Sequence, residues 1–259
     1  ILSIDASTQS VYHFSDTDKN ISLLDISETF GTYDGSFVLY DNNLDSWKIY
    51  DLEEATKRIP PESTYKIYDA LLGLESGIIT PEHSSMTWNG DAFPFPSWEA
   101  DQDLNSAMQN SVNWYFQAID SQLGINRVQE FLNKIEYGNQ TTSSNLDLYW
   151  SDFSLKISPL EQVTLLKKFN TNEFHLNSQN VFSVKNAIKI ASTPNGNFYG
   201  KTGTGRVNGQ DINGWFIGYV ETSDNSYYFA TNIQSDSNAT GKKAFEITSD
   251  ILKKLHIWN

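Results

Sequence analysis

Strand-like patterns of apolar residues lie towards the two ends of the chain. Residues 35–40 and 47–50 each predict a strand, and Asp41-Asn42-Asn43 between them predicts a turn, so this segment is expected to form a β-hairpin. After residue 195 the pattern of apolar and polar residues is again typical of strands. Three successive strands are predicted there, at residues 198–203, 214–220 and 227–233.

Between these strands the spacing of apolar residues is helical. Pro60 and Pro61 end any regular structure, and residues 63–74 directly after them predict a mostly buried helix. From about residue 80 to 165 the pattern predicts helices separated by aromatic loops, one of them at residues 94–98. Further helices are predicted at residues 104–119 and 161–169 and, with one apolar side, over residues 245–255.

Strands at both ends and helices between them predict an α+β fold. The expected architecture is an antiparallel β-sheet flanked by helices, with an inserted all-helical subdomain. The length of 259 residues fits a single domain. Its mixed α/β part is expected at about residues 1–75 and 166–259, and its helical part at about residues 76–165.

Composition and charge exclude several classes of function. The net charge of −14 repels phosphate backbones, so no nucleic-acid partner is expected. The chain has no cysteine, which excludes disulfides and thiolate metal sites. The four histidines show no metal-binding spacing, so no metal and no cofactor are predicted; they are His13, His83, His175 and His256.

No apolar run reaches the roughly 18 to 20 residues that cross a bilayer. The chain begins at Ile1 rather than at a methionine. We therefore expect it to be a processed product or a fragment of a longer protein, with any membrane anchor upstream.

Ser63 and Lys66 are candidates for nucleophilic catalysis. Their spacing of three residues places both side chains on one face of the predicted helix. A base must take the serine proton before the hydroxyl attacks well, and a lysine can be that base once burial lowers its pKa. Roughly one Ser-x-x-Lys is expected by chance in a chain this long. Alone, the pair favours a simpler interpretation, a helix-capping serine followed by a solvated lysine.

A second motif, Ser111-Val112-Asn113, lies in the predicted helix 104–119. Ser-x-Asn patterns also begin at Ser143, Ser178 and Ser223, so the bare pattern is not specific. The last of these spells Ser-Asp-Asn but lies in a predicted hairpin turn, which indicates turn chemistry.

A third motif, Lys201-Thr202-Gly203, occurs once and lies on a predicted strand. A strand edge can pair with an extended acyl-amide substrate. The lysine would attract a carboxylate, the threonine offers a hydroxyl, and the glycine lets a ligand approach the backbone. An ordinary edge strand with a protective lysine is the alternative interpretation.

Taken together, the three motifs follow the order known from serine β-lactamases and penicillin-binding proteins. A fourth, Tyr137-Gly138-Asn139, resembles the Tyr-Gly-Asn signature of class D β-lactamases. Two more segments are similar to class D sequences: residues 61–66 resemble Pro-x-Ser-Thr-Phe-Lys, and Tyr149-Trp150 with residues 157–162 resembles the loop that covers the active site.

The resemblance is closer still to the extracellular sensor domains of MecR/BlaR-type β-lactam signal transducers of Gram-positive bacteria, the methicillin-resistance sensors in particular. Residues 103–116 and 201–205 carry it. The similarity runs from about Gly35 to the C-terminus, nearly nine-tenths of the chain.

The resemblance implies catalytic roles for four residues. Ser63 would be the acylated nucleophile and Lys66 its base, with N-carboxylation of Lys66 by carbon dioxide in the ligand-free state. Ser111 would pass a proton to the ring nitrogen. The backbone N–H groups of Ser63 and Thr204 would form the oxyanion hole.

Ligand binding is implied for a second set of residues. Lys201 and Thr202, together with Thr204, would hold the ligand carboxylate, and Trp150 would pack over Lys66. The full set of implied binding residues is Asn113, Tyr137, Trp150, Lys201, Thr202 and Gly203.

Asn113 is a departure from the class D pattern. Class D enzymes end the second motif with a valine, where this chain has Asn113. A valine keeps the surroundings of the lysine dry, which favours the neutral amine and its carbamate. An asparagine oxygen can instead accept from an ammonium, which would stabilise charged Lys66 and pull it away from its catalytic position. Since hydrolysis of the ester needs a base, Ser63 is expected to acylate readily while the ester persists.

Three functions remain open from the sequence. The leading one is a receptor whose Ser63 is acylated by β-lactam antibiotics and which signals across the membrane to induce resistance, with very slow deacylation rather than turnover. The alternatives are a secreted class D β-lactamase and a D,D-peptidase, although Tyr137-Gly138-Asn139 argues against the peptidase. The receptor would lie on the extracellular face of the membrane, with transmembrane and zinc-protease regions upstream.

Overall fold

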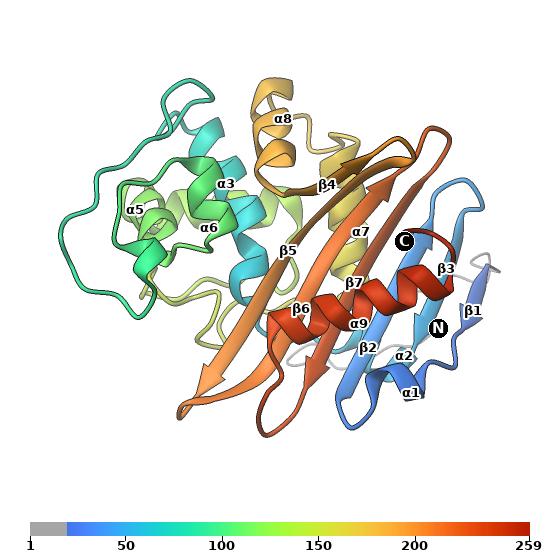
Figure 1. The fold of residues 1–259 in the computed structure, drawn as a ribbon. Coiled ribbons are helices and arrows are strands. Elements are labelled where there is room, and N and C mark those ends of the chain that lie inside the picture. The colour runs from blue at the N-terminus through green and yellow to red at the C-terminus, as the bar shows by residue number, and fades with distance from the viewer. Residues whose placement is uncertain (1–19) are drawn as a thin grey trace.

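The computed structural model describes residues 20–259 and builds them around one seven-stranded sheet (Figure 1). The strand order is β1-β3-β2-β7-β6-β5-β4. Neighbouring strands pair antiparallel except β1, which pairs parallel to β3. The strands are β1 (Ile21–Leu23), β2 (Asp34–Asp41), β3 (Ser46–Tyr50), β4 (Lys189–Thr193), β5 (Gly196–Val207), β6 (Gln210–Glu221) and β7 (Ser226–Gln234).

An early strand and a late strand of the chain meet in the middle of this sheet. β2 pairs with β7 over its whole length, for example Phe37 with Thr231. The predicted hairpin forms as β2 and β3, and the three predicted late strands form as β5, β6 and β7. The predicted α+β fold is therefore confirmed, and β1 adds a short parallel edge strand that the polar N-terminal pattern did not predict.

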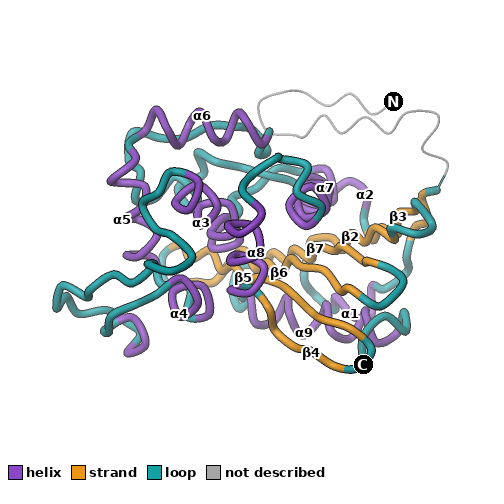
Figure 2. Tube along the Cα trace, turned by 90° about the horizontal axis from the view of Figure 1, so that it is seen from above, coloured by secondary structure: helices purple, strands orange, loops and turns teal. Residues whose placement is uncertain are grey.

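Helices cover both faces of the sheet (Figure 2). α9 and α1 lie on one face, where their apolar side chains pack on Phe37, Phe216 and Phe229. The other face carries α2 and α7, and the helices α3, α5 and α6 lie beside the sheet beyond β5. The helices are α1 (Ser27–Phe30), α2 (Leu52–Thr56), α3 (Lys66–Glu75), α4 (Leu104–Gln109), α5 (Asn113–Leu123), α6 (Ile125–Ile135), α7 (Pro159–Asn170), α8 (Ser178–Ala187) and α9 (Gly241–Lys254), with 3₁₀ turns η1 (Glu62–Tyr65) and η2 (Pro96–Trp98).

Two predicted helices are divided in the structure. The helix predicted at residues 63–74 begins as the turn η1, so Ser63 lies in a 3₁₀ turn and Lys66 opens α3. The helix predicted at residues 104–119 is broken into α4 and α5, and Ser111 in the break has φ 54°. Apolar spacing did not reveal the break, because both halves bury residues at helical spacing.

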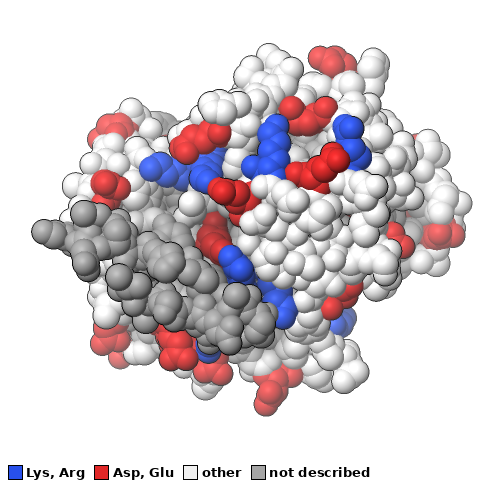
Figure 3. All heavy atoms as spheres, turned by 180° about the vertical axis from the view of Figure 1, so that it is seen from behind, with Lys and Arg blue, Asp and Glu red and all other residues white. Residues whose placement is uncertain are grey.

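The whole of α7 packs on β2 and β7, so it lies with the sheet although the predicted helical part extended to about residue 165. Residues 1–19 of the predicted domain, with His13, lie outside the described residues. Across residues 20–259, no helix has both the length and the apolar character that a membrane span needs. On the face opposite to that of Figure 1, basic side chains of the described residues lie interspersed with acidic ones (Figure 3).

Candidate active site

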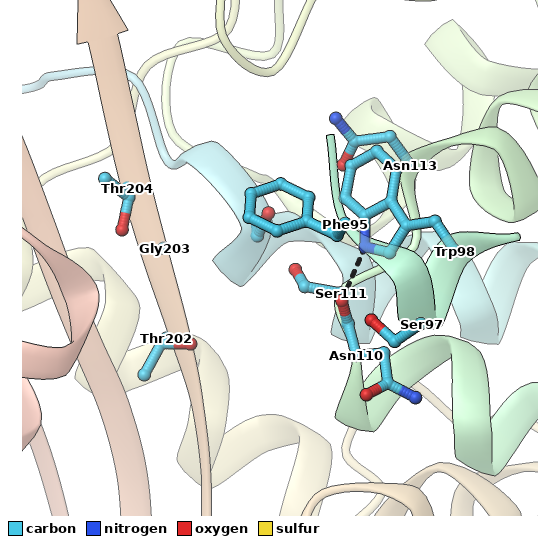
Figure 4. A pocket seen from close by; sticks show the side chains of 10 residues that line it. Phe95, Ser97, Trp98, Asn110, Ser111, Asn113, Thr202, Gly203 and Thr204 are labelled. Atoms are coloured by element: carbon cyan, nitrogen blue, oxygen red, sulfur yellow. Dashed lines mark hydrogen bonds between the residues drawn. The ribbon is translucent and has the colours of Figure 1, made fainter. Parts of the chain in front are cut away.

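A cleft of about 340 Å³ opens between β5 and the break that separates α4 from α5. Figure 4 shows Thr202 to Thr204 on one side of it and Ser111 with Asn113 on the other. Six of the ten predicted site residues line this cleft, namely Ser63, Ser111, Asn113, Thr202, Gly203 and Thr204. The fold therefore brings together motifs that are far apart in the sequence.

Ser63 and Lys66 are in direct contact. Lys66 Nζ lies 2.8 Å from Ser63 Oγ. Residues three apart are nearly eclipsed in a 3₁₀ turn, so η1 aligns the two side chains although Ser63 precedes α3. A neutral amine at this distance can take the serine proton.

The surroundings of Lys66 favour the neutral amine. The side chain is only 1% exposed, and the rings of Phe116 and Trp150 each lie 5.6 Å from Nζ. Burial and then the positive charge of Lys201 hold the pKa of Lys66 well below its usual value, against the opposing effect of nearby acids. These conditions suit a lysine that acts as a base.

Asn113 reaches the same amine from the start of α5. Its Oδ1 accepts a hydrogen bond of 2.7 Å from Lys66 Nζ. The expectation that Asn113 draws Lys66 away from Ser63 is wrong for this structure, since Nζ keeps both contacts. The reason is geometric: η1 and the start of α5 flank Nζ, so the amide reaches it without displacing it.

Ser111 and Lys201 form a second pair across the cleft. Lys201 Nζ donates to Ser111 Oγ at 3.0 Å and to the Thr202 carbonyl at 3.0 Å. Burial lowers the pKa of Lys201 to about 7. Ser111 reaches this lysine from a left-handed backbone conformation, a type of strain that is common at functional sites.

β5 presents its motif to the cleft because its edge is free there. β4 pairs with β5 only between Gly196 and Tyr199, so the strand beyond Tyr199 faces η1. Thr204 also caps the first turn of α9, since its Oγ1 accepts from the Gly241 N–H at 2.8 Å. The hydroxyl proton of Thr204 remains available to a ligand.

Gly203 lies where β5 approaches the nucleophile most closely. A Cβ at this position would lie 3.2 Å from the backbone nitrogen of Ser63 and 3.1 Å from Glu62 Cβ. These contacts are tighter than usual and involve backbone, so β5 would have to move away from η1. Gly203→Ala is therefore expected to slow acylation of Ser63 about tenfold, by displacing the Thr204 N–H that is expected to be a donor of the oxyanion hole. Stopped-flow acylation measures this. The control is Gly77→Ala, at an exposed position after α3 where a Cβ would meet no atom within 4 Å. Equal rates in Gly203→Ala and the wild type would exclude this role.

Trp150 and Tyr137 lie outside the cleft lining. The Trp150 ring packs beside Lys66, as described above. Tyr137 is fully buried between the rings of Tyr65 and Tyr68, at 5.1 and 5.2 Å, so its prediction as a substrate-binding residue is wrong. The aromatic packing behind η1 and α3 leaves it no path to the cleft.

The rest of the Tyr-Gly-Asn motif holds a loop in place. Asn139 Nδ2 donates to the Ser154 carbonyl at 2.7 Å, and its Oδ1 accepts from the Lys156 N–H at 2.9 Å. Gly138 has φ +49°, and a Cβ there would lie 1.9 Å from the Lys156 carbonyl oxygen. The motif thus anchors the loop that carries Trp150, which is a structural role.

Four lining residues were not predicted individually. Phe95, Ser97 and Trp98 come from the aromatic loop at residues 94–98, and Asn110 ends α4. The Trp98 indole donates to the Asn110 carbonyl at 2.9 Å, which ties the loop to the break (Figure 4). The only sequence signal was the cluster of aromatic residues in a loop. Within residues 20–259, no group of three His, Cys, Asp or Glu side chains is placed to hold a metal ion.

Comparison with known proteins agrees with this geometry. Residues 31–253 match the family described as "Penicillin binding protein transpeptidase domain". The chain is 46% identical over 241 residues to "Regulatory protein BlaR1" of Bacillus licheniformis, covering 92% of this chain and 40% of that protein. It is 42% identical over 228 residues to "Methicillin resistance mecR1 protein" of Staphylococcus aureus, covering 88% of this chain and 39% of that protein. The chain thus spans about two-fifths of the length of these curated relatives.

Solved structures show the same likeness. The "C-terminal domain of the Bacillus licheniformis BlaR penicillin-receptor" superposes with a TM-score of 0.90 at 46% identity, covering 93% of this chain and 98% of that one. "Class D beta-lactamase BAT-2" superposes with a TM-score of 0.85 at 36% identity, covering 91% and 97%. The predicted resemblance to MecR/BlaR-type sensor domains and class D β-lactamases is confirmed, and the chain belongs to the penicillin-binding protein transpeptidase domain family.

Proposed function

We propose that this chain is the receptor domain for β-lactam antibiotics in a signalling protein, and that Ser63 carries the antibiotic as a long-lived ester. The observation that supports this most directly is the position of Lys66. Its Nζ is shared between Ser63 Oγ, at 2.8 Å, and Asn113 Oδ1, at 2.7 Å. The first contact serves acylation, and the second opposes hydrolysis of the product.

Acylation follows from the two lysine pairs. Neutral Lys66 takes the hydroxyl proton of Ser63 while Oγ forms a bond to the lactam carbonyl carbon and the ring C–N bond breaks. Ser111 gives its proton to the ring nitrogen and takes one from the Lys201 ammonium, 3.0 Å away. The backbone N–H groups of Ser63 and Thr204 stabilise the oxyanion, and Lys201 and Thr202 attract the ligand carboxylate.

The ester persists because no suitable base remains. After acylation Ser63 Oγ is an ester oxygen and a weak acceptor, so the Lys66 ammonium keeps its hydrogen bond to Asn113. Burial raises the pKa of the neighbouring Glu62 to about 8, so this carboxyl is mostly protonated at neutral pH. Glu161 is occupied by Arg58 and by the N-terminal cap of α7. The Ser111–Lys201 pair is the remaining candidate, and the ligand carboxylate would hold Lys201 as an ammonium in the acylated state. Among the described residues, water therefore lacks an activating group near the ester.

In the ligand-free state, Lys66 would react with carbon dioxide only as the neutral amine. Its lowered pKa and the apolar rings of Phe116 and Trp150 favour that form. The carbonyl oxygen of Asn113, which faces Nζ, opposes a carbamate unless the amide turns its N–H₂ group inward. We therefore propose that carboxylation of Lys66 is reversible and easily lost on acylation.

The proposal extends to the rest of the protein. The BlaR1 and mecR1 relatives are more than twice as long as this chain. Our chain would be their extracellular portion, on the membrane of a Gram-positive bacterium. Transmembrane and zinc-protease regions would precede it and turn acylation into a signal that induces resistance.

Intact-mass measurement tests the proposal. On mixing with benzylpenicillin, the protein is expected to gain the mass of one penicillin within minutes and to keep it for hours, because the ester forms fast and hydrolyses slowly. Ser63→Ala is expected to gain nothing. An adduct that vanishes while benzylpenicillin is consumed catalytically would contradict the receptor.

Catalytic consumption of benzylpenicillin would identify a class D β-lactamase. The similarity to "Class D beta-lactamase BAT-2" makes this the second candidate function. Release of D-alanine from a D-Ala-D-Ala peptide would identify a D,D-peptidase instead. Both activities are measured on the same preparation, with Ser63→Ala as the control.

A further inference from the structure

Two buried carboxyl groups lie directly behind the site. Asp69 on α3 and Asp120 on α5 are both 0% exposed. Asp69 follows Lys66 by one turn of α3, and Asp120 follows Phe116, whose ring lies 5.6 Å from Lys66 Nζ, by one turn of α5. The two acids therefore lie between the helix that carries Lys66 and the helix that begins with Asn113.

The carboxyls have few partners apart from each other. Asp69 and Asp120 lie within hydrogen-bonding reach of one another. The Tyr149 hydroxyl also lies within reach of Asp120. Within residues 20–259, however, none of the four carboxyl oxygens accepts a hydrogen bond of regular geometry from another side chain or from the backbone. Two carboxylates so close in a buried site repel each other strongly, whereas one shared proton converts the repulsion into a hydrogen bond.

The electrostatics of the pair agree with a retained proton. Burial, and for Asp69 then the second acid, raise the pKa of both carboxyls. Lys66 is the cation that faces Asp69, and Lys66 itself also faces Glu62 and Lys201. The other titratable groups that face the pair are Tyr65, Tyr149 and the exposed Asp147.

We propose that Asp69 and Asp120 share one proton at neutral pH and form a positioning pair, whose single negative charge stabilises the ammonium of Lys66 as it takes the proton from Ser63. The inference rests on the proposed acylation of Ser63. It adds two residues that touch neither the ligand nor the reacting atoms. The same charge favours the Lys66 ammonium after acylation, so it acts in the same direction as Asn113 in preserving the ester.

Asparagine variants separate charge from packing, because an amide has nearly the size of a protonated carboxyl. In Asp120→Asn the single negative charge of the pair has to lie on Asp69, next to Lys66, where the carboxylate accepts from the new amide. In Asp69→Asn the charge lies on Asp120, farther from Lys66. The double variant has no charge at this place. Asp147→Asn removes an exposed, solvent-screened charge nearby and is the matched control.

The pH dependence of acylation is the first measurement. Acylation rises with pH as Lys66 loses its proton, so the midpoint of the rise follows the pKa of Lys66. In the double variant we expect this midpoint to fall by about one pH unit or more, since an opposite charge nearby raises a lysine pKa by that order. Asp69→Asn is expected to lie between it and the wild type. Asp120→Asn and Asp147→Asn are expected to keep the wild-type midpoint.

The pH dependence of thermal unfolding is a second measurement, which needs no ligand. Acids whose folded-state pKa is raised give stability that is present at low pH and is lost as pH rises through the folded pKa. The fall in Tm between pH 5 and pH 8 is therefore expected to be smaller by several degrees in the double variant. Glu62 contributes equally to both proteins and cancels from the comparison.

The two measurements distinguish this inference from the proposed function. An unchanged acylation midpoint in a folded double variant would overturn the positioning role while leaving acylation of Ser63 intact. An unchanged fall in Tm would overturn the shared proton, whether or not the wild type forms an adduct. A wild type that gains no mass with benzylpenicillin would instead refute the proposed function.

Discussion

Lys66→Met is expected to slow acylation of Ser63 by roughly 10² to 10⁴-fold, the usual contribution of a positioned general base. Lys66 Nζ is the basic group that contacts Ser63 Oγ, at 2.8 Å. Methionine replaces the aliphatic part of the side chain but cannot accept the proton. Burst-phase release from a chromogenic cephalosporin, checked by intact mass, gives the acylation rate.

The same substitution is expected to leave Tm close to that of the wild type. Lys66 is 1% exposed, so its removal ends a costly burial of an amine. This gain offsets the loss of the hydrogen bond to Asn113. Loss of acylation in a stable protein would separate chemistry from folding.

Lys167→Met is the matched control. Lys167 is also partly buried, and its Nζ lies 4.6 Å from the centre of the Tyr40 ring on β2, away from the cleft beside β5. Acylation at the wild-type rate is expected there. If Lys66→Met also acylated at that rate, the base would have to be another group, and the Ser111–Lys201 pair is the one that the cleft offers.

Asn113→Val is expected to shorten the lifetime of the adduct by about 10²-fold, and by more when bicarbonate is added. Valine removes the oxygen that accepts from Lys66 Nζ at 2.7 Å and leaves apolar surface in its place. The equilibrium of Lys66 then shifts from the ammonium towards the neutral amine and its carbamate, and either of these can activate water. Loss of the adduct mass over time measures the lifetime.

Carbon-13 NMR with labelled bicarbonate checks the cause of this effect. A carbamate signal that grows in Asn113→Val and is absent in Asn113→Val/Lys66→Met is expected. Asn105→Val changes an exposed amide on α4 and is expected to keep the long-lived adduct. An unchanged adduct lifetime in Asn113→Val would show that Asn113 does not protect the ester.

The sequence by itself determined the main elements and the reactive residues. Alternating apolar residues specified the strands that became β2, β3, β5, β6 and β7, because strand periodicity is a local property. The order of Ser63, Lys66 and Lys201-Thr202-Gly203 indicated the chemistry, since each motif is contiguous or lies within one turn. These features need no knowledge of which segments meet in space.

The tertiary structure decided what the residues touch. Lys66 contacts Asn113, 47 positions away in the sequence, and Lys201 contacts Ser111, 90 positions away. A local sequence pattern cannot predict contacts between residues that far apart. The break at Ser111 and the burial of Tyr137 likewise depend on neighbours from other elements.

The pairing of Asp69 with Asp120 is another contact that only the tertiary structure decided. Each acid alone fits the polar positions of its helix, and only the packing of α3 against α5 places both out of water and beside each other. The chemical groups were therefore readable from the sequence. Their protonation states were decided by the fold, because burial and the approach of distant charges set a pKa.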